Sequence, residues 1–439
     1  MVSETNSEST AGPSIRDAHH DIEEGEVSGQ AWLCAISSGL GYMFDAYVVN
    51  VYSYVLPLIA VSLAASNAEL GYIGSALLAG YMLGTFLFGW LADRFGRKPA
   101  LGASILGYGV TTALTGIAPT LPIFGALRFL TGIGGAGEFA VAVPYVTEVW
   151  PKKRRMFGGG GVVFSMYAAG AILALLMALF FAPRFGWQAA FVLAIVPALI
   201  VFGLRKGLNE SARHHDIKTE QEPGASWHDG IRIIFSHPTL RKRYIIGSLL
   251  FTANAVGYWG FLVFLTQYLI TVYHLTFTDA LKVQFFFFGA MMVFPFIGSW
   301  AAETFGRKKA GIVGGIFIAI VSVAGFSVHT LTLFVVLETF GIGMLGYTWA
   351  VAQVYTSELF PTKIRGTGFG LVVATGRTPA ILGPAITGVL ISSVGLGTVA
   401  QWFAVVWVLY IVGFLLGPET KGRTLEEIAP SSMLDREAA

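Results

Sequence analysis

Long apolar stretches separated by short polar ones make up most of the 439-residue chain. A helix needs about 20 residues to cross about 30 Å of hydrocarbon. On that measure the chain predicts twelve membrane-spanning segments, at residues 31–62, 70–91, 99–118, 121–148, 157–182, 187–206, 244–272, 280–301, 309–328, 331–359, 366–394 and 399–417. The expected fold class is therefore an all-α membrane protein with 12 transmembrane helices.

The longest polar stretch between apolar blocks divides the segments into two groups of six. We expect a disordered cytoplasmic tail, a six-helix bundle, a cytoplasmic linker, a second six-helix bundle and a second cytoplasmic tail, at residues 1–30, 31–206, 207–243, 244–417 and 418–439. The first tail is polar and acidic, without the basic start of a cleaved signal. Within the linker, SWHDGIRIIF forms either a short helix at the membrane surface or part of a disordered tether.

Composition agrees with a lipid environment and argues against other partners. Hydrophobic residues make up 54% of the chain and charged residues 12%, whereas soluble domains carry about 25% charge. A net charge of +2 is too small to indicate a nucleic-acid partner. The single cysteine, Cys34, excludes a disulfide within the chain.

Basic residues predict the orientation. The connections after the even-numbered segments hold 20 Lys or Arg, eight of them between Arg205 and Arg243. The connections after the odd-numbered segments hold only Arg184 and Lys282. Because Lys and Arg stay on the cytoplasmic side, we expect both termini in the cytoplasm and the protein in a bacterial inner or plasma membrane.

Two motifs occur twice at the same spacing of 210 residues. FGRK stands at 95–98 and at 305–308. PYVTEVWPKKRRMFG at 144–158 corresponds to VYTSELFPTKIRGTG at 354–368, where Glu148 matches Glu358 and Arg155 matches Arg365. Two unrelated motifs at one spacing indicate that the halves are duplicated modules.

These motifs resemble the major facilitator superfamily. GWLADRFGRK at 89–98, RFLTGIG at 128–134, NESAR at 209–213 and PETKGR at 418–423 are similar to that family's signatures. The resemblance implies two six-helix bundles around a central cavity that work by alternating access, an architecture known for this family. FDAY at 44–47, GAGEF at 135–139 and GRTPAILGP at 376–384 look most like the proton-coupled organic-acid symporters, the aromatic-acid and sialate groups.

Charged residues at the predicted cytoplasmic ends indicate a latch. Asp93 can pair with a cation or with the N-terminal end of another helix, and Gly89 allows close helix packing. Glu148 with Arg155, and Glu358 with Arg365, can form matching ion networks between helices. Such pairs, which break and reform as the halves rock, would gate the cytoplasmic side; the alternative is that these charges only set topology. The expected gate residues are Gly89, Asp93, Arg94, Gly96, Arg97, Lys98, Glu148, Arg155, Glu303, Arg307, Glu358 and Arg365.

Three ionisable residues inside the first bundle are candidates for proton coupling. Asp45 lies 14 residues after Ala31, about 20 Å along a helix. An ionisable group within a span is costly unless it faces a partner or water. Burial favours a protonated carboxyl, as a proton carrier requires. Glu138 is expected to bind a second proton or to tune Asp45, and Arg128 to assist proton release; the alternatives are structural contacts between helices or, for Arg128, snorkelling to the interface.

Arg377 is the candidate anchor for a substrate carboxylate. It lies about twelve residues into its segment, and arginine stays charged and binds carboxylates in a bidentate way. The alternative is a salt bridge at the cytoplasmic gate. Asn254, Tyr258 and Gln353 are the further substrate-binding candidates, each with helix packing as its alternative.

The sequence thus predicts a monomeric secondary transporter that imports a small organic anion with protons. A neutral-sugar symporter, a proton-coupled efflux antiporter and a sensing receptor are the other hypotheses. No hydrolase, zinc-protease or nucleotide-binding motif occurs, so an enzyme is not expected. We expect no cofactor, because the energy comes from a proton gradient, although sodium remains open as the coupling ion.

Overall fold

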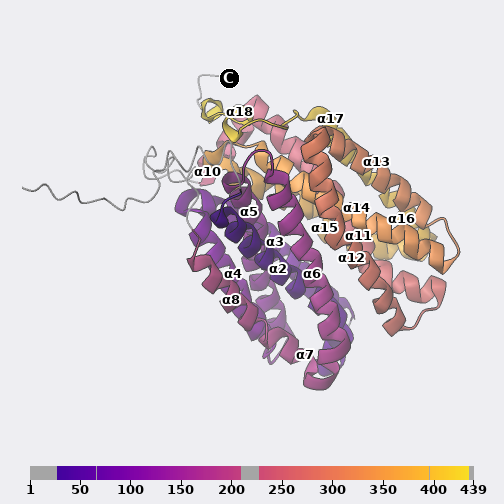
Figure 1. Ribbon diagram of the computed structural model, residues 1–439. Coiled ribbons are helices and arrows are strands. Elements are labelled where there is room, and N and C mark those ends of the chain that lie inside the picture. The colour runs from indigo at the N-terminus through magenta and orange to yellow at the C-terminus, as the bar shows by residue number, and fades with distance from the viewer. Residues whose placement is uncertain (1–26, 66, 209–226, 395, 435–439) are drawn as a thin grey trace, which may run out of the picture.

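The computed structural model describes residues 27–65, 67–208, 227–394 and 396–434, and in these ranges the chain is helical, without a strand (Figure 1). Residues 1–26 of the predicted tail and 209–226 of the linker lie outside the described residues. The helices of the first half are α2 (Gly29–Ser62), α3 (Asn67–Phe95), α4 (Arg97–Thr115), α5 (Leu121–Val149), the π-helix η1 (Phe157–Val162), α6 (Val163–Leu176), the π-helix η2 (Met177–Phe181), α7 (Ala182–Val192) and α8 (Ile195–Lys206).

The second half repeats this order after a short helix from the linker. Its elements are α10 (Trp227–Ser236), α11 (Pro238–Tyr273), α12 (Phe277–Phe305), α13 (Arg307–Gly325), α14 (Leu331–Glu358), the 3-10 helix η3 (Thr362–Ile364), α15 (Arg365–Val394), α16 (Leu396–Phe403), α17 (Val406–Leu416), α18 (Leu425–Ile428) and η4 (Ser431–Leu434).

Two predicted segments are interrupted. The segment at 187–206 is divided between α7 and α8 by a turn at Leu193 and Ala194, and the segment at 399–417 is divided between α16 and α17 by a turn at Ala404 and Val405. These turn residues are as apolar as their neighbours and include no Gly, Pro or charge. The hydrophobic pattern therefore does not show either break. The first break has another cause in the sequence, because Pro197 has no N–H to donate to the carbonyl of Leu193.

Eight helices in the described ranges are long and apolar enough to cross a membrane. This number is smaller than the twelve segments that the pattern predicts. Val406–Leu416, for example, is apolar but shorter than a full span. The described helices nevertheless follow the predicted segments in order along the chain.

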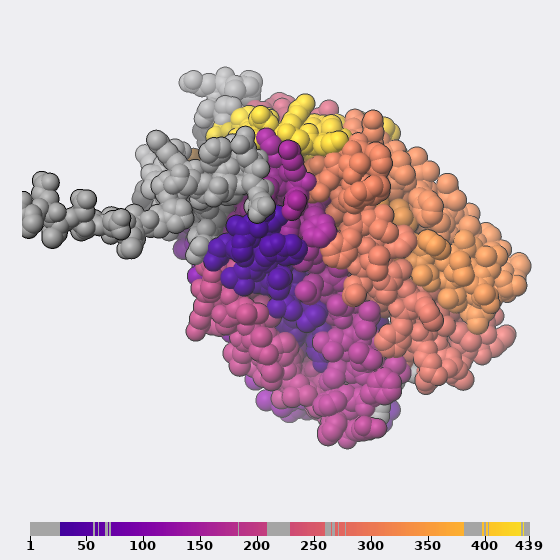
Figure 2. Space-filling model, in the orientation of Figure 1, coloured from indigo at the N-terminus to yellow at the C-terminus, as the bar shows by residue number. Residues whose placement is uncertain are grey.

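The two halves lie side by side, as the indigo-to-magenta and orange parts of Figures 1 and 2 show. Helices α3 and α15 pack together between the halves, and so do α6 and α12. These two contacts are related by the 210-residue repeat. We call the end where α2 begins and α17 ends the tail side, and the opposite end the far side; the charge pattern predicts that the tail side is cytoplasmic.

Glycines set the distance between α3 and α15. A Cβ atom on Gly89 would lie 2.4 Å from the carbonyl oxygen of Gly366, and one on Gly366 would lie 2.6 Å from that of Gly89. Real Cβ atoms do not approach backbone so closely. The glycine of the first motif therefore allows direct backbone contact between the halves, in keeping with the small residues found where membrane helices pack.

The linker contributes one helix to the tail side. In α10, Ile234 is buried with Leu240 and Ile364, and Phe235 packs edge-on against Tyr244 at 5.1 Å. Of the two structures considered for this stretch, a helix is the one observed. It lies against the beginning of α15.

Substituting Gly89 tests this contact. Gly89→Ala is expected to lower the melting temperature of the purified protein by several degrees, because overpacking costs about 1–3 kcal/mol. Gly107→Ala, in α4, is the matched control, since a Cβ atom there meets nothing within 4 Å. Equal melting temperatures for the two variants would show that the α3–α15 distance is not tightly constrained.

Candidate functional site

The repeated motifs meet in a buried ion network at the tail side. Arg97 donates to Asp93 at 2.6 Å and to Glu148 at 2.9 Å, within the first half. Arg365 of the second half also donates to Glu148, at 2.9 Å. The Asp93 carboxylate accepts from the backbone N–H of Gly366, at 2.9 Å, in the first turn of α15. Asp93 thus pairs with a cation and with a helix N-terminus together.

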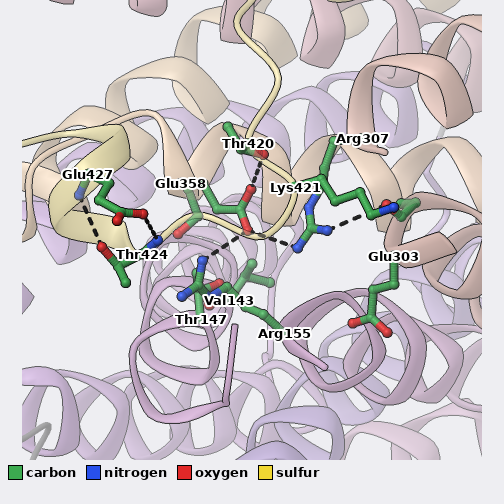
Figure 3. A network of polar contacts seen from close by, with 12 residues as sticks. Val143, Thr147, Arg155, Glu303, Arg307, Glu358, Thr420, Lys421, Thr424 and Glu427 are labelled. Carbon is green, nitrogen blue, oxygen red and sulfur yellow. Dashed lines mark hydrogen bonds and ion pairs between the residues drawn. The ribbon is translucent and has the colours of Figure 1, made fainter. Parts of the chain in front are cut away.

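The second copies of these residues make the equivalent contacts (Figure 3). Arg307 donates to Glu358 at 3.4 Å within the second half, and Arg155 of the first half donates to Glu358 at 3.1 Å. Glu303 accepts from the backbone N–H of Phe157 at 3.2 Å, where η1 begins. Arg307, Glu358 and Arg155 lie 210 residues from their counterparts in the first network. Phe157 corresponds in the same way to Thr367, whose backbone N–H also donates to Asp93.

The C-terminal segment after α17 also contacts this network. Thr420 donates its hydroxyl to Glu358, and Lys421 donates to the carbonyl of Thr304 at 2.8 Å. Arg243, at the start of α11, donates to the carbonyls of Leu359 and Ile428, each at 2.7 Å. The chain after α17 is therefore fastened to the same carboxylate as the inter-half ion pair.

Three expected gate residues lie apart from these pairs. Arg94 is exposed and stacks over Trp90 and Phe95, each at 5.5 Å. Lys98 donates to the carbonyls of Lys206 and Leu208 in its own half. Gly96 has a φ of 111° in the turn between α3 and α4, which a side chain would strain.

Asp45 is buried in the centre of the first half. It is 1% exposed, and neither of its carboxylate oxygens has a hydrogen-bond partner in the described part of the chain. Gly135 of α5 makes room for it, because a Cβ atom there would lie 2.8 Å from Oδ1 of Asp45 and 2.7 Å from the hydroxyl of Tyr81. The carboxyl group thus lies between α2, α3 and α5.

Arg377 lies on α15, at the contact between the halves. Its guanidinium carbon is 3.9 Å from the ring centre of Phe139 and 5.1 Å from that of Tyr81, both in the first half. It is buried, and its Nε has no hydrogen-bond partner among the described residues. Arg377 and Asp45 are close enough to interact electrostatically, although they form no ion pair.

Glu138 forms an ion pair with Arg205, an arginine that the count of basic residues places in the connection before Arg243. Arg205 is buried at the end of α8 and donates to both carboxylate oxygens of Glu138, at 2.7 and 2.6 Å. Counting Arg205 as a loop charge was therefore wrong. Its position within the predicted segment 187–206 was the available signal. Gly41 of α2 packs against this pair, one helical turn before Asp45.

Arg128 is fully buried near the far side, where its guanidinium contacts other parts of the first half. It donates to the carbonyl of Val48 at 3.3 Å and lies over the rings of Tyr52 and Phe191, at 4.9 and 5.7 Å. Glu338 occupies the equivalent position of the second half and is also buried, with no partner for its Oε1 among the described residues.

The three further substrate candidates differ in their contacts. Both polar atoms of the Asn254 amide form hydrogen bonds. Its Nδ2 donates to the carbonyl of Leu250 at 3.0 Å, and its Oδ1 accepts from the hydroxyl of Thr348 at 2.8 Å. Gln353 accepts from the hydroxyl of Tyr42 at 3.0 Å, and its buried Nε2 has no partner in the described ranges.

Aromatic rings complete the centre, and of these the sequence indicated only Tyr258, the third substrate candidate, as a site residue. Tyr258 meets the ring of Tyr167 edge-on at 6.1 Å, and Tyr167 meets Phe139 in the same way at 5.9 Å. Phe139 also packs against Tyr42 at 4.4 Å. In helices this apolar throughout, periodicity does not reveal which face points inward. The one signal for Phe139 was its position next to Glu138.

Comparison with known proteins identifies the family. The model of the Major Facilitator Superfamily matches residues 38–294, and that of the Sugar (and other) transporter family matches residues 215–431. The niacin transporter NiaP of Acinetobacter baylyi is 29% identical over 89% of this chain and 94% of its own. The sialic acid transporter NanX of Escherichia coli is 30% identical over 82% of this chain and 87% of its own.

A solved structure has the same fold. The proton:xylose symporter XylE, bound to a bromo-deoxy sugar, superposes with a TM-score of 0.79 at 20% identity, covering 92% of this chain and 99% of that one. This match implies a twelve-span architecture. The chain belongs to the major facilitator superfamily, in its sugar-and-other-transporter branch, and is a multi-pass secondary transporter, not an enzyme.

Removing a shared carboxylate tests the tail-side network. Glu148→Gln removes the carboxylate that Arg97 and Arg365 share, so that Arg97 keeps only its pair with Asp93. Breaking a buried pair costs about 3–5 kcal/mol. We expect a cysteine at position 147, in a Cys34→Ser background, to react severalfold faster with a water-soluble maleimide in purified Glu148→Gln. Asp279→Asn, which removes an exposed pair with Lys282, is the control. If the cysteine reacts at the same rate in Glu148→Gln and in Asp279→Asn, Glu148 does not hold the tail side closed.

Proposed function

We propose that the protein imports a small organic carboxylate together with a proton, by alternating access of two six-helix bundles at residues 31–206 and 244–417. The observation that carries this proposal is the buried guanidinium of Arg377 at the contact between the halves. It has an unpartnered N–H and stands within electrostatic reach of the unpartnered Asp45 carboxyl. A cation in this place suits an anionic substrate.

Relatives support the class of substrate. Niacin and sialic acid, named for two transporters similar to this chain, are both carboxylic acids. A planar guanidinium donates two parallel hydrogen bonds to a carboxylate and stays charged at every physiological pH. The proposal assigns this contact to Arg377, and a further donor contact to the free Nε2 of Gln353.

Charge balance links the proton to the substrate. Without substrate, an ionised Asp45 offsets the charge of Arg377. When a substrate carboxylate binds Arg377, an ionised Asp45 becomes a second anion in a region of low dielectric, which is costly. Protonation of Asp45 removes that cost. One proton is therefore taken up with each carboxylate.

The tail-side network supplies the alternation, with the tail side in the cytoplasm. The pairs Arg155–Glu358 and Arg365–Glu148 join the halves, whereas Arg97–Glu148 and Arg307–Glu358 lie within one half. Opening the tail side breaks the first two pairs and leaves each glutamate one arginine. No buried carboxylate loses all its partners, so the two arrangements can be close in free energy.

Glu138 and Arg128 serve the proton site in different ways. Because Arg205 holds both oxygens of Glu138, the contacts favour a fixed charge over a second proton carrier. Arg128 interacts electrostatically with Asp45 from the far side, and its Nε and Nη2 have no partner among the described residues. This position supports the release of a proton from Asp45 when the far side opens.

The remaining candidates explain less. A neutral-sugar symporter has the same fold in XylE, but at 20% identity that likeness extends to the fold alone, and a neutral sugar gives no reason to bury Arg377. Proton-coupled efflux is disfavoured because the fifth segment of this chain lacks the proline-rich motif that antiporters of this family typically carry.

Coupling is tested in lightly buffered proteoliposomes. External pH is recorded while nicotinate, benzoate and sialic acid are added in turn, with xylose as the neutral comparison. We expect external alkalinisation with at least one acid, and loss of that signal in Asp45→Asn while exchange of labelled acid continues. Asp279→Asn should behave as the unmodified protein. Normal coupling in Asp45→Asn would refute the role of Asp45, and a response to xylose alone would refute the acid.

The anchor is tested by a substitution that keeps the charge. Arg377→Lys loses the planar pair of donors, and the loss of a charge-assisted hydrogen bond raises KM roughly ten- to a hundredfold. Arg94→Lys, at an exposed position, is the control and should leave KM unchanged. If KM for the acid is the same in Arg377→Lys, a bidentate carboxylate contact is excluded.

A further inference from the structure

The inference concerns Phe139, a residue of α5 to which the proposed function gives no task. Its ring is 3% exposed. One side of the ring meets the Arg377 guanidinium, with 3.9 Å between ring centre and guanidinium carbon. Tyr42 and Tyr167 pack around it at 4.4 and 5.9 Å. The contact with Arg377 crosses from the first half to the second.

Opposite charges in a buried site normally combine. A carboxylate and a guanidinium in a low-dielectric interior attract each other strongly, and an Arg–Asp pair is among the strongest hydrogen-bonded contacts in proteins. Yet both Asp45 oxygens and the Arg377 Nε have no partner among the described residues. Some other contact must hold the guanidinium away from Asp45.

The other charges near Asp45 do not account for this. Glu138 is saturated by Arg205 and makes no ion pair with Arg377. Arg128 is held at the far side by the Val48 carbonyl and the Tyr52 ring. The described contacts of the Arg377 guanidinium are with aromatic rings, Phe139 at the shorter distance and Tyr81 at 5.1 Å.

We propose that Phe139 is a positioning residue that holds Arg377 apart from Asp45 and so keeps its N–H groups available to the substrate carboxylate. The negative face of an aromatic ring attracts a guanidinium without using its in-plane N–H donors. A carboxylate can therefore bind the edge of a guanidinium whose face rests on Phe139. This inference depends on the proposed function, because it assumes that Arg377 binds the substrate.

Without the Phe139 ring, Asp45 should compete with the substrate carboxylate for Arg377. In Phe139→Leu the guanidinium has no ring to rest on, so it can turn to Asp45 and form an internal ion pair. The substrate acid must then displace Asp45 before it binds. The expected result is a rise in KM of about tenfold, in the range of buried cation–π contacts, with little change in kcat. Phe139→Tyr keeps the ring and should restore KM.

A double-mutant cycle compares the effect of Phe139→Leu in the unmodified protein with its effect in Asp45→Asn. An asparagine in place of Asp45 cannot form the internal ion pair, so Phe139→Leu should raise the Kd of the acid by less than about twofold in that background. A purely structural defect would raise Kd equally in both backgrounds. Binding of nicotinate, benzoate and sialic acid to the purified protein is the measurement, because it does not require proton coupling.

Two controls separate the possible failures. Phe414→Leu removes a buried ring that packs on Tyr355 and Tyr410, away from Arg377, and should leave Kd unchanged. Phe139→Met replaces Phe139→Leu if the latter does not fold. If Arg377→Ala abolishes acid binding but Phe139→Leu has no effect, or the same effect with and without Asp45, Phe139 has no positioning role. If Arg377→Ala binds the acid normally, the proposed anchor is wrong and this inference fails with it.

Discussion

The ion pairs between the two halves at the tail side are the interaction on which the rest of the structure depends. Charges buried in a low-dielectric interior are tolerated only when they are paired and hydrogen-bonded. Glu148 and Glu358 each bind one arginine of their own half and one of the other. These shared carboxylates bring α3 against α15 and α6 against α12.

The centre of the molecule shows the opposite arrangement. There Asp45 and Arg377 are buried without the partners that such groups normally have. The proposed function assigns a proton to Asp45 and an anion to Arg377, because each would relieve the energetic cost of a buried charge without a partner. The Arg377 guanidinium lies against the rings of Phe139 and Tyr81. Aromatic rings attract a cation without using its hydrogen-bond donors, and so favour a guanidinium that has no ion pair.

The duplication is symmetrical in the network and asymmetrical in the centre. The pairs between arginines and Glu148 or Glu358 each have a counterpart 210 positions away. The ion pair of Asp93 with Arg97, in contrast, has no equivalent between Glu303 and Arg307 among the described residues. Asp45, in contrast, corresponds to Ala255, and Arg377 corresponds to Tyr167. Each half thus contributes one of the two central charges. A coupled transporter built in this way needs both halves in contact at the centre for the charges to influence each other.

The sequence by itself determined the class of protein, the order of the helices and the tail-side residues. These follow from apolar length, from the distribution of Lys and Arg, and from motifs repeated at one spacing, all of which are properties of the chain in one dimension. The motifs suggested networks of Glu148 with Arg155 and of Glu358 with Arg365. In the structure the ion pairs cross between the halves, Arg365 with Glu148 and Arg155 with Glu358.

Only the tertiary structure decided which side chains meet in the centre. Arg205 lies close to the linker in sequence and was counted with it, yet it is buried against Glu138, because the end of α8 packs beside α4 and α2. Phe139 and Tyr42 differ in no visible way from other aromatic residues of the chain. In helices that are apolar on every side, burial carries no periodic signal, so the inward face is set by packing against other helices.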